Sequence, residues 1–171
     1  MAAAQSLKAR ALQWLAQREH SRVELRRKLL RLVRQRTVAD AAGADPAAGG
    51  AVEALADVDA LLDWLTDKRY LSNARFVESR VNARVARYGN VRIRQELKLH
   101  GAALDSAAIE RLNGSELARA QAVWARKYGD KPTEAAAERS RQMRFLAGRG
   151  FSADVIRRVV RGGEAEPGEH G

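Results

Sequence analysis

Residues 88–101, with the sequence YGNVRIRQELKLHG, hold the clearest fold signal in the chain. The opening Tyr-Gly-Asn interrupts the apolar pattern before it, and Asn90 is of the type that caps the first turn of a helix. Gly101 ends the segment as a helix C-cap glycine does. Between them, the expected helix carries the apolar side chains Val91, Ile93 and Leu97. The stretch therefore predicts one amphipathic helix with a turn at each end.

The same signals recur on both sides of this helix and predict eight more helices. Ser21 and Glu24 fit a capping box, in which hydroxyl and carboxylate satisfy opposite backbone N–H groups. Further capping residues are Ser72, Asp105, Ser115 and Ser152. In the helix expected at 52–68, the side chains that should face the core are Leu55, Val58, Leu61, Leu62 and Leu65. The expected ranges are 7–15, 21–33, 52–68, 72–85, 105–112, 115–128, 133–149 and 152–160.

The nine expected helices fall into three groups of three. Tyr88-Gly89 recurs as Tyr128-Gly129, and the Leu97 to Gly101 spacing recurs as Leu146 to Gly150. Such recurrence predicts an all-α protein of three tandem three-helix repeats, forming an elongated, curved array. The expected divisions are a first repeat at 1–68 with a flexible linker at 37–50, a second at 69–113, a third at 114–161, and a disordered acidic tail at 162–171.

The composition supports helices and excludes several classes of protein. Only 5% of residues are aromatic and only 3 are proline, so long Ala- and Leu-rich helices go uninterrupted. No cysteine occurs, which removes disulfides and thiolate sites. No apolar run approaches the ~18 residues of a transmembrane helix, and the first residues lack a signal-peptide pattern. We therefore expect a cytoplasmic protein without membrane association.

The net charge of +10, from 31 basic and 21 acidic side chains, favours a polyanionic or acidic partner. Basic side chains dominate residues 1–36, 64–101 and 119–161, whereas acidic ones dominate the segments between them. Each basic stripe alone could be a solvated helix face, but like charges at i, i+4 are mildly destabilising, which favours a binding surface for the set. The candidate residues for binding a partner or DNA are Arg27, Arg31, Arg34, Arg75, Arg80, Arg84, Arg87, Arg92, Arg94 and Lys98.

No constellation of residues predicts catalysis, a metal site or a bound cofactor. His20 and His100 stand beside expected helix ends, and His170 lies in the acidic tail. Asp59 and Asp63 share a helix face, where a solvated acidic surface is the simpler interpretation than an acid–base pair. The three tryptophans lie on different expected helices, which favours core packing: Trp14, Trp64 and Trp124.

Several of these segments, in this order, resemble the RecX family. The resemblance rests on 88–101, on RYLSNARFV at 69–77, on SRVELRRKL at 21–29, on RKYG at 126–129 and on RFLAGRGF at 144–151, and it extends over residues 7–161. One departure is Arg69, which stands where the family pattern has glycine before Tyr70 and puts the local turn in doubt.

The resemblance implies a non-enzymatic regulator that binds RecA filaments on single-stranded DNA. It further implies that the protein lodges in the helical groove of the filament. There it would limit filament growth, ATP hydrolysis, strand exchange and the co-protease activity that triggers the SOS response. We expect a monomer without cofactors that has, in addition, weak direct affinity for DNA. The alternatives are a general helical DNA-binding or architectural protein, which the charge also fits, and a helical scaffold, which leaves the charge blocks unexplained.

Overall fold

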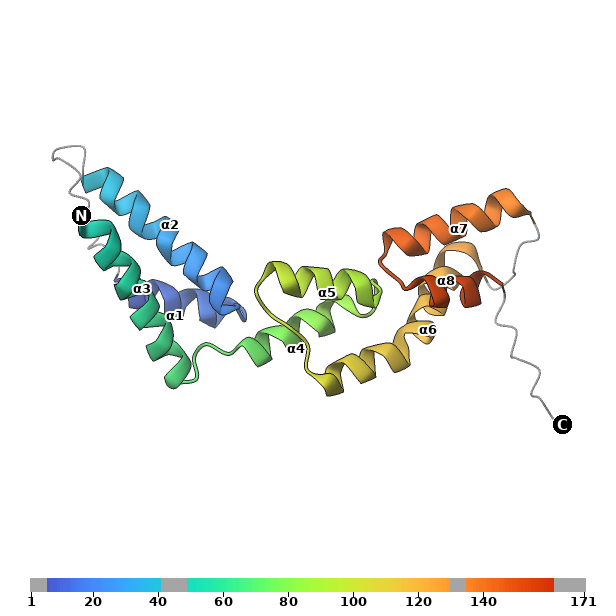
Figure 1. Cartoon of the computed structure of the whole chain (residues 1–171), viewed down its shortest axis with the longest axis horizontal. Helices are drawn as coiled ribbons and strands as arrows, with labels where there is room; N and C mark the ends of the chain where they lie inside the picture. The colour runs from blue at the N-terminus through green and yellow to red at the C-terminus, as the bar shows by residue number, and fades with distance from the viewer. Residues whose placement is uncertain (1–5, 41–48, 130–134, 162–171) are drawn as a thin grey trace. The chain divides into compact units, whose positions relative to one another are not determined.

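The computed structural model describes residues 6–40, 49–129 and 135–161, and every regular element in these ranges is an α-helix. The all-α expectation is therefore confirmed. The helices are α1 (Leu7–Gln17), α2 (Arg22–Asp40), α3 (Gly49–Asp67), α4 (Asn73–Arg84), α5 (Asn90–Leu99), α6 (Ser106–Tyr128), α7 (Ala136–Gly148) and α8 (Ala153–Val160) (Figure 1). They fall into two compact units, divided within α4 after Ser79, with residues 100–102 belonging to the first.

The first unit is built on α1, α2 and α3, and α2 and α3 lie side by side (Figure 1). Trp14 and Trp64 are half-buried against its core. Leu55 was expected inward but is 39% exposed, since it lies on the outer side of α3. The apolar faces of the three helices and the following turn bury Ala11, Leu25, Leu29, Val58, Leu62, Leu65 and Leu71.

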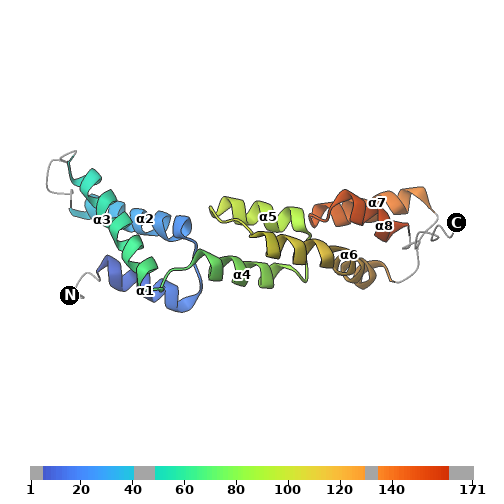
Figure 2. The same ribbon diagram turned by 60° about the horizontal axis from the view of Figure 1, so that its bottom comes forward.

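The second unit is built on α6, α7 and α8, which pack against one another, with α5 against α6 (Figure 2). Trp124 is 6% exposed in this core, as expected for a packing residue, and Leu97 and Ile93 are buried on α5. Val91, in the first turn of α5, is 44% exposed. The core of α6, α7 and α8 buries Ala120, Val123, Trp124, Leu146, Phe151, Ile156, Val159 and Val160.

Two expectations about helix limits are wrong. The helices expected at 105–112 and 115–128 form the single helix α6, so the described residues hold eight helices. Asp105 caps it, accepting a hydrogen bond from the Ala108 N–H at 2.6 Å. The linker expected at 37–50 is helical at 37–40 and at 49–50, because α2 meets no glycine or proline before 43. Residues 41–48 and the tail at 162–171 lie outside the described residues.

Three turns share one geometry and carry the repeated motif seen in the sequence. A buried leucine lies four residues before a residue with positive φ: Leu65 before Arg69 (φ 61), Leu97 before Gly101 (φ 63) and Leu146 before Gly150 (φ 79). Arg69 is the one non-glycine among the described residues with positive φ. The turn after α3 therefore keeps the geometry of the others despite an unfavourable residue type, for which strain is of order 1 kcal/mol or more.

Candidate interaction surfaces

The basic side chains of α2 divide between two faces. Arg26 and Arg22 point toward α3, where they pair with Asp59 at 2.6 Å and Asp63 at 2.7 Å. The Arg26 hydrogen bond lowers the pKa of the Asp59 carboxyl. The stripe expected on the opposite face is exposed and forms no ion pair with any residue that the structure describes: Arg27, Arg31 and Arg34. This face of α2 keeps its full positive charge.

Two of the three arginines in the stripe expected on α4 share one carboxylate. Arg84 pairs with Glu96 of α5 at 2.9 Å, and Arg80 contacts the same carboxylate at 3.3 Å. The hydrogen bond to Glu96 raises the pKa of Arg84. The third member of the stripe, Arg87, lies in the turn after α4 and is exposed. One carboxylate thus holds α4 and α5 together with two of the three arginines.

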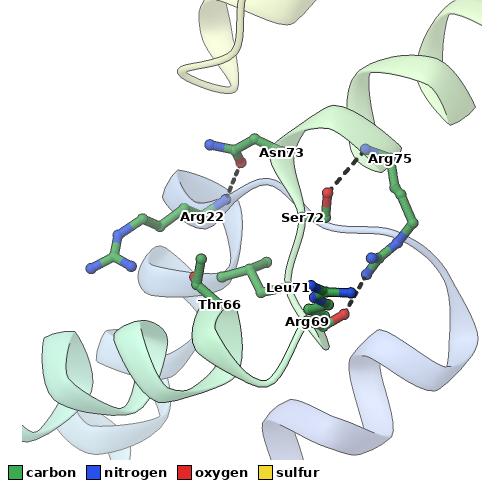
Figure 3. A pocket seen from close by; sticks show the side chains of 7 residues that line it. All are labelled: Arg22, Thr66, Arg69, Leu71, Ser72, Asn73 and Arg75. Atoms are coloured by element: carbon green, nitrogen blue, oxygen red, sulfur yellow. Dashed lines mark hydrogen bonds between the residues drawn. The ribbon is translucent and has the colours of Figure 1, made fainter.

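Arg75 supports the turn after α3. Its Nε donates to the Glu19 carboxylate at 2.7 Å. Its Nη2 donates to the Arg69 carbonyl oxygen at 3.0 Å (Figure 3), and to that of Tyr70 at the same distance. Asn73 Oδ1 accepts from the backbone N–H of Arg22 at 3.0 Å in the same region. The hollow here has a volume of about 420 Å³ and is lined by Arg22, Thr66, Arg69, Leu71, Ser72, Asn73 and Arg75 (Figure 3).

The expected cations of α5 are exposed but differ in their contacts. The Arg92 guanidinium lies 4.4 Å from the centroid of the Tyr88 ring and donates to the Gly148 carbonyl at 3.3 Å. Arg94 donates to the Asn113 Oδ1 at 2.9 Å. Lys98 has no ion pair with a described residue. Arg92 and Arg94 therefore help fix α5 against neighbouring elements, and Lys98 remains available.

Sequence reasoning missed a second concentration of positive charge, in the second unit. A hollow of about 300 Å³ is lined by Arg87, Arg126, Lys127 and Arg149 together with Ala86, Val123 and Phe145. Three of these cations are absent from the expected stripes because they come from helix ends far apart in the chain. The motifs at 126–129 and 144–151 contain them, but neither motif alone indicates that they meet.

A buried carboxylate joins the starts of two helices in the same unit. Glu116 of α6 is 4% exposed, and its Oε1 accepts from the backbone N–H groups of Asn90 at 2.9 Å and Ser152 at 3.2 Å. Its Oε2 accepts from the Ser152 hydroxyl at 3.0 Å. Ser152 is thus at the N-cap position of α8, as expected, but its hydroxyl bonds Glu116 and not the helix backbone. Glu116 gives first-turn N–H groups the acceptor that a local cap would supply.

Asn90 is likewise not the side-chain cap that the sequence predicts. It is the first residue of α5 and is buried, and its Nδ2 donates to Asn113 Oδ1 at 3.0 Å. Its Oδ1 accepts from Arg119 at 2.5 Å, and Arg119 also donates to the Tyr88 carbonyl at 2.8 Å. Burial lowers the pKa of Arg119, and Glu116 acts in the opposite direction. The turn at 88–90 is therefore held by side chains of α6.

The capping box at the start of α2 forms only in half. Ser21 Oγ accepts from the Glu24 N–H at 3.0 Å, but the Glu24 carboxylate contacts Arg18 and lies 3.2 Å from the Nδ1 of His20. His20 is 1% exposed. Burial lowers the pKa of His20, although Glu24 raises it. This histidine is part of the packing between α1 and α2.

No group of three His, Asp or Glu side chains within 6–40, 49–129 and 135–161 is placed to hold a metal ion. In the same ranges, no helix combines the length and apolar character needed to cross a membrane. His170 lies outside them. The arrangement supports binding through charged surfaces.

Known proteins of similar sequence identify the family of this chain. The family model described as RecX, third three-helix domain, matches residues 115–160. A regulatory protein RecX of Ralstonia nicotianae is 46% identical over 162 residues, covering 94% of this chain and 89% of the relative. Regulatory proteins RecX of Leptothrix cholodnii (46% identical; 91% and 88% covered) and Herminiimonas arsenicoxydans (44%; 93% and 93%) are similar over nearly as much. The resemblance found in the sequence is thereby confirmed, and the chain belongs to the RecX family of regulatory proteins.

Proposed function

We propose that this protein binds RecA filaments on single-stranded DNA and restrains their growth, ATP hydrolysis, strand exchange and co-protease activity. The observation that carries the proposal is the match to regulatory proteins RecX over more than nine tenths of the chain. In this proposal the protein acts by binding alone, and it needs no cofactor and catalyses no reaction. It works as a monomer in the cytoplasm, as part of DNA repair and the SOS response.

The exposed stripe of α2 supports a contact with an acidic or polyanionic surface. Arg27, Arg31 and Arg34 are exposed and lack carboxylate partners among the described residues, so a ligand does not have to displace an internal ion pair. Arginine pairs with carboxylates and phosphates through two parallel hydrogen bonds. Contacts from such a stripe and from cations elsewhere in the chain add through effective concentration, so weak single contacts suffice.

The deciding experiment measures RecA ATP hydrolysis on single-stranded DNA while this protein is titrated from well below to equimolar with RecA. Filament control predicts inhibition at substoichiometric ratios, because one bound regulator affects many protomers. The alternative, a general DNA-binding protein, predicts inhibition only when the protein occupies much of the DNA. In that case added DNA restores the hydrolysis rate. Absence of inhibition at any ratio would contradict the proposed function.

A direct binding measurement complements the kinetics. Preformed RecA filaments on immobilised single-stranded DNA, stabilised with a non-hydrolysable nucleotide, should retain the protein more strongly than the DNA alone. The expected retention falls as salt rises, because charged surfaces make the contact. Equal retention by bare DNA and by filaments would favour the general DNA-binding alternative.

A further inference from the structure

The hollow of about 300 Å³ in the second unit, called the cationic hollow below, is lined by four cations without an ion pair to a described carboxylate. Arg126 and Lys127 come from the last turn of α6, Arg149 follows α7, and Arg87 lies in the turn after α4. Arg149 also donates to the Arg87 carbonyl at 3.4 Å, which holds these two segments together. Because four like charges around one recess repel one another, an anion that enters it is favoured.

The Phe145 ring orients two of these cations without neutralising them. The Lys127 Nζ lies 4.0 Å from the centroid of this ring, and the Arg149 Cζ lies 5.2 Å from it. A cation beside an aromatic ring is attracted to it but keeps its net charge and its N–H donors. An occupant of the cationic hollow therefore meets positive groups that are already held in place, so binding it costs little side-chain entropy.

The carboxylates of the second unit that the structure describes do not line the cationic hollow. Most of them already have partners within helices or between them, as ion pairs or as acceptors for helix N–H groups. Those engaged in this way are Glu96, Asp105, Glu116, Glu138 and Asp154. An anionic occupant must therefore come from outside the described part of the unit.

The segment that directly follows α8 carries the opposite charge. Residues 162–171, with the sequence GGEAEPGEHG, contain three glutamates and no lysine or arginine. This acidic tail lies outside the described residues, but the point from which it leaves the second unit is Arg161, just after α8. Three negative charges thus start from a known position in the unit that holds the four unpaired cations.

The acidic tail is long enough to reach the cationic hollow. The helix α8 packs against α6 and α7, whose ends carry three of the four cations. It is about 12 Å long, and the four residues from Arg149 to its first residue add at most about 14 Å. The eight residues from Arg161 to Glu169 span up to about 28 Å when extended. Glu169 can therefore return along the whole of α8 to Arg149.

We propose that the acidic tail folds back onto the cationic hollow of its own chain and occupies it until a stronger acidic ligand displaces it. Glutamate carboxylates pair with arginine through two parallel hydrogen bonds and with lysine as a point charge. The short tether raises the effective concentration of the tail to the order of millimolar, so weak single pairs are enough. The inference goes beyond the proposed function, because it concerns a contact within one chain and does not depend on RecA.

Zero-length carbodiimide cross-linking of the full chain tests the contact directly, because it joins a lysine amine to a carboxylate only where the two touch. Lys98 is the matched control, since it is exposed like Lys127 and lies in the same unit but on α5. Peptide mass spectrometry should find the tail glutamates joined to Lys127 at least about fivefold more often than to Lys98. The variant Lys127→Arg keeps the charge and should abolish that product. Equal yields at the two lysines would overturn the proposal.

Mixing isotope-labelled and unlabelled protein separates the tail of the same chain from the tail of a second copy. If the contact is within one chain, each cross-linked product carries one isotope composition only, and the yield per chain is unchanged on dilution. Products that join a labelled chain to an unlabelled one would identify a second copy as the source of the tail and overturn the proposal.

Fluorescence anisotropy with a labelled oligoglutamate peptide measures whether the tail keeps an external acidic ligand out. A tail variant with all three glutamates changed to glutamine should bind this peptide about fivefold more tightly, because its own tail no longer competes. A control variant makes the same change in net charge at exposed positions elsewhere and should alter the affinity by less than about twofold, since salt screens distant charges. The control substitutions are Asp67→Asn, Glu78→Gln and Glu110→Gln.

Removing two cations of the hollow shows whether the gain in affinity arises there. In the background Arg87→Ala/Arg126→Ala, both at exposed positions, the tail variant should bind the peptide no more tightly than the chain with its glutamates intact. Far-UV circular dichroism checks that every variant folds. The proposal is overturned by equal gains in the tail and control variants, by no gain in the tail variant, or by a gain that survives loss of the two arginines.

Discussion

Gly89 lies with its backbone directly against that of Gly150: a Cβ atom on Gly89 would fall 2.2 Å from the Gly150 carbonyl oxygen. The Gly89 N–H donates to the Arg149 carbonyl at 3.0 Å, and the Val91 N–H donates to the Gly150 carbonyl at the same distance. A Cβ on Gly150 would in turn fall 2.4 Å from the Cβ of Arg92. The Tyr88-Gly89-Asn90 turn at the start of α5 therefore packs directly against the turn after α7.

Replacing Gly89 by alanine should lower the free energy of unfolding by about 2 kcal/mol or more, because backbone atoms have no room to move away from the new methyl group. Urea unfolding followed by circular dichroism measures the change. Gly114→Ala is the matched control: it lies within α6 with no atom within 4 Å of a new Cβ. That change should raise stability by about 0.5–1 kcal/mol. Equal effects of the two substitutions would contradict the close approach.

Glu116→Ala should destabilise the second unit by about 3 kcal/mol or more. The change leaves the Asn90 and Ser152 N–H groups without their acceptor and removes a negative charge that favours the charged form of half-buried Arg119. Thermal unfolding measures the loss. Glu96→Ala is the control, because its carboxylate is 21% exposed and its pairs with α4 should contribute less than about 1 kcal/mol. A smaller loss for Glu116 than for Glu96 would contradict the role of the buried carboxylate.

Arg69→Gly should raise the free energy of unfolding by roughly 1 kcal/mol, since glycine adopts the φ of 61° without steric cost. Chemical denaturation measures the difference. Arg69→Ala serves as control, because alanine removes the same side chain but keeps the Cβ strain. If alanine stabilised the chain as much as glycine, the side chain and not the backbone angle would be the source of the effect.

Acid should weaken the first unit through His20. Burial lowers the pKa of this histidine in the folded chain below the ordinary histidine value of about 6.5, so the unfolded chain takes up the proton first as pH falls. Its contribution is therefore complete above pH 6.5 and is lost progressively below it. Urea midpoints measured on either side of this pH should fall toward acid, and His20→Gln should flatten the trend. A midpoint that rises toward acid would contradict the burial effect.

The free stripe on α2 should matter more for filament inhibition than for stability. The triple change of Arg27, Arg31 and Arg34 to alanine removes exposed side chains, so stability should change by less than about 0.5 kcal/mol. The concentration needed for half-inhibition of RecA hydrolysis should rise at least several-fold. Alanine at Arg139, Arg144 and Arg158, also exposed, is the control with equal charge loss. Similar inhibition by the two triple variants would exclude this face of α2.

Local caps and apolar periodicity were enough to predict where most helices lie. They were not enough to predict whether a helix continues through a weak position. Asn113-Gly114 has the composition of a break, yet α6 runs through it. Asn113 accepts hydrogen bonds from Asn90 and Arg94, and the Ser115 hydroxyl donates back to the Arg111 carbonyl. Packing of Leu112 on one side and Ala120 on the other outweighs the low helix propensity between them. Such partners come from another helix and leave no trace in local sequence.

The candidate surfaces show the same limit. Periodicity places Arg80, Arg84 and Arg87 on one face of the chain, but only tertiary structure shows that Glu96 takes the first two. Likewise the hollow with Arg126 and Arg149 joins helix ends that spacing alone cannot bring together. Charge signs and helix faces are local properties of a sequence. Which cations remain free depends on contacts between helices.

Because α6 contacts α5 as well as α7 and α8, opening any one of them exposes surface of a helix on which the others depend. Hydrogen exchange at the amides of α5, α6, α7 and α8 should therefore occur through one common opening event, with similar protection along the buried face of α6. The second unit would then behave as a single cooperative block, and not as a chain of modules that melt in turn.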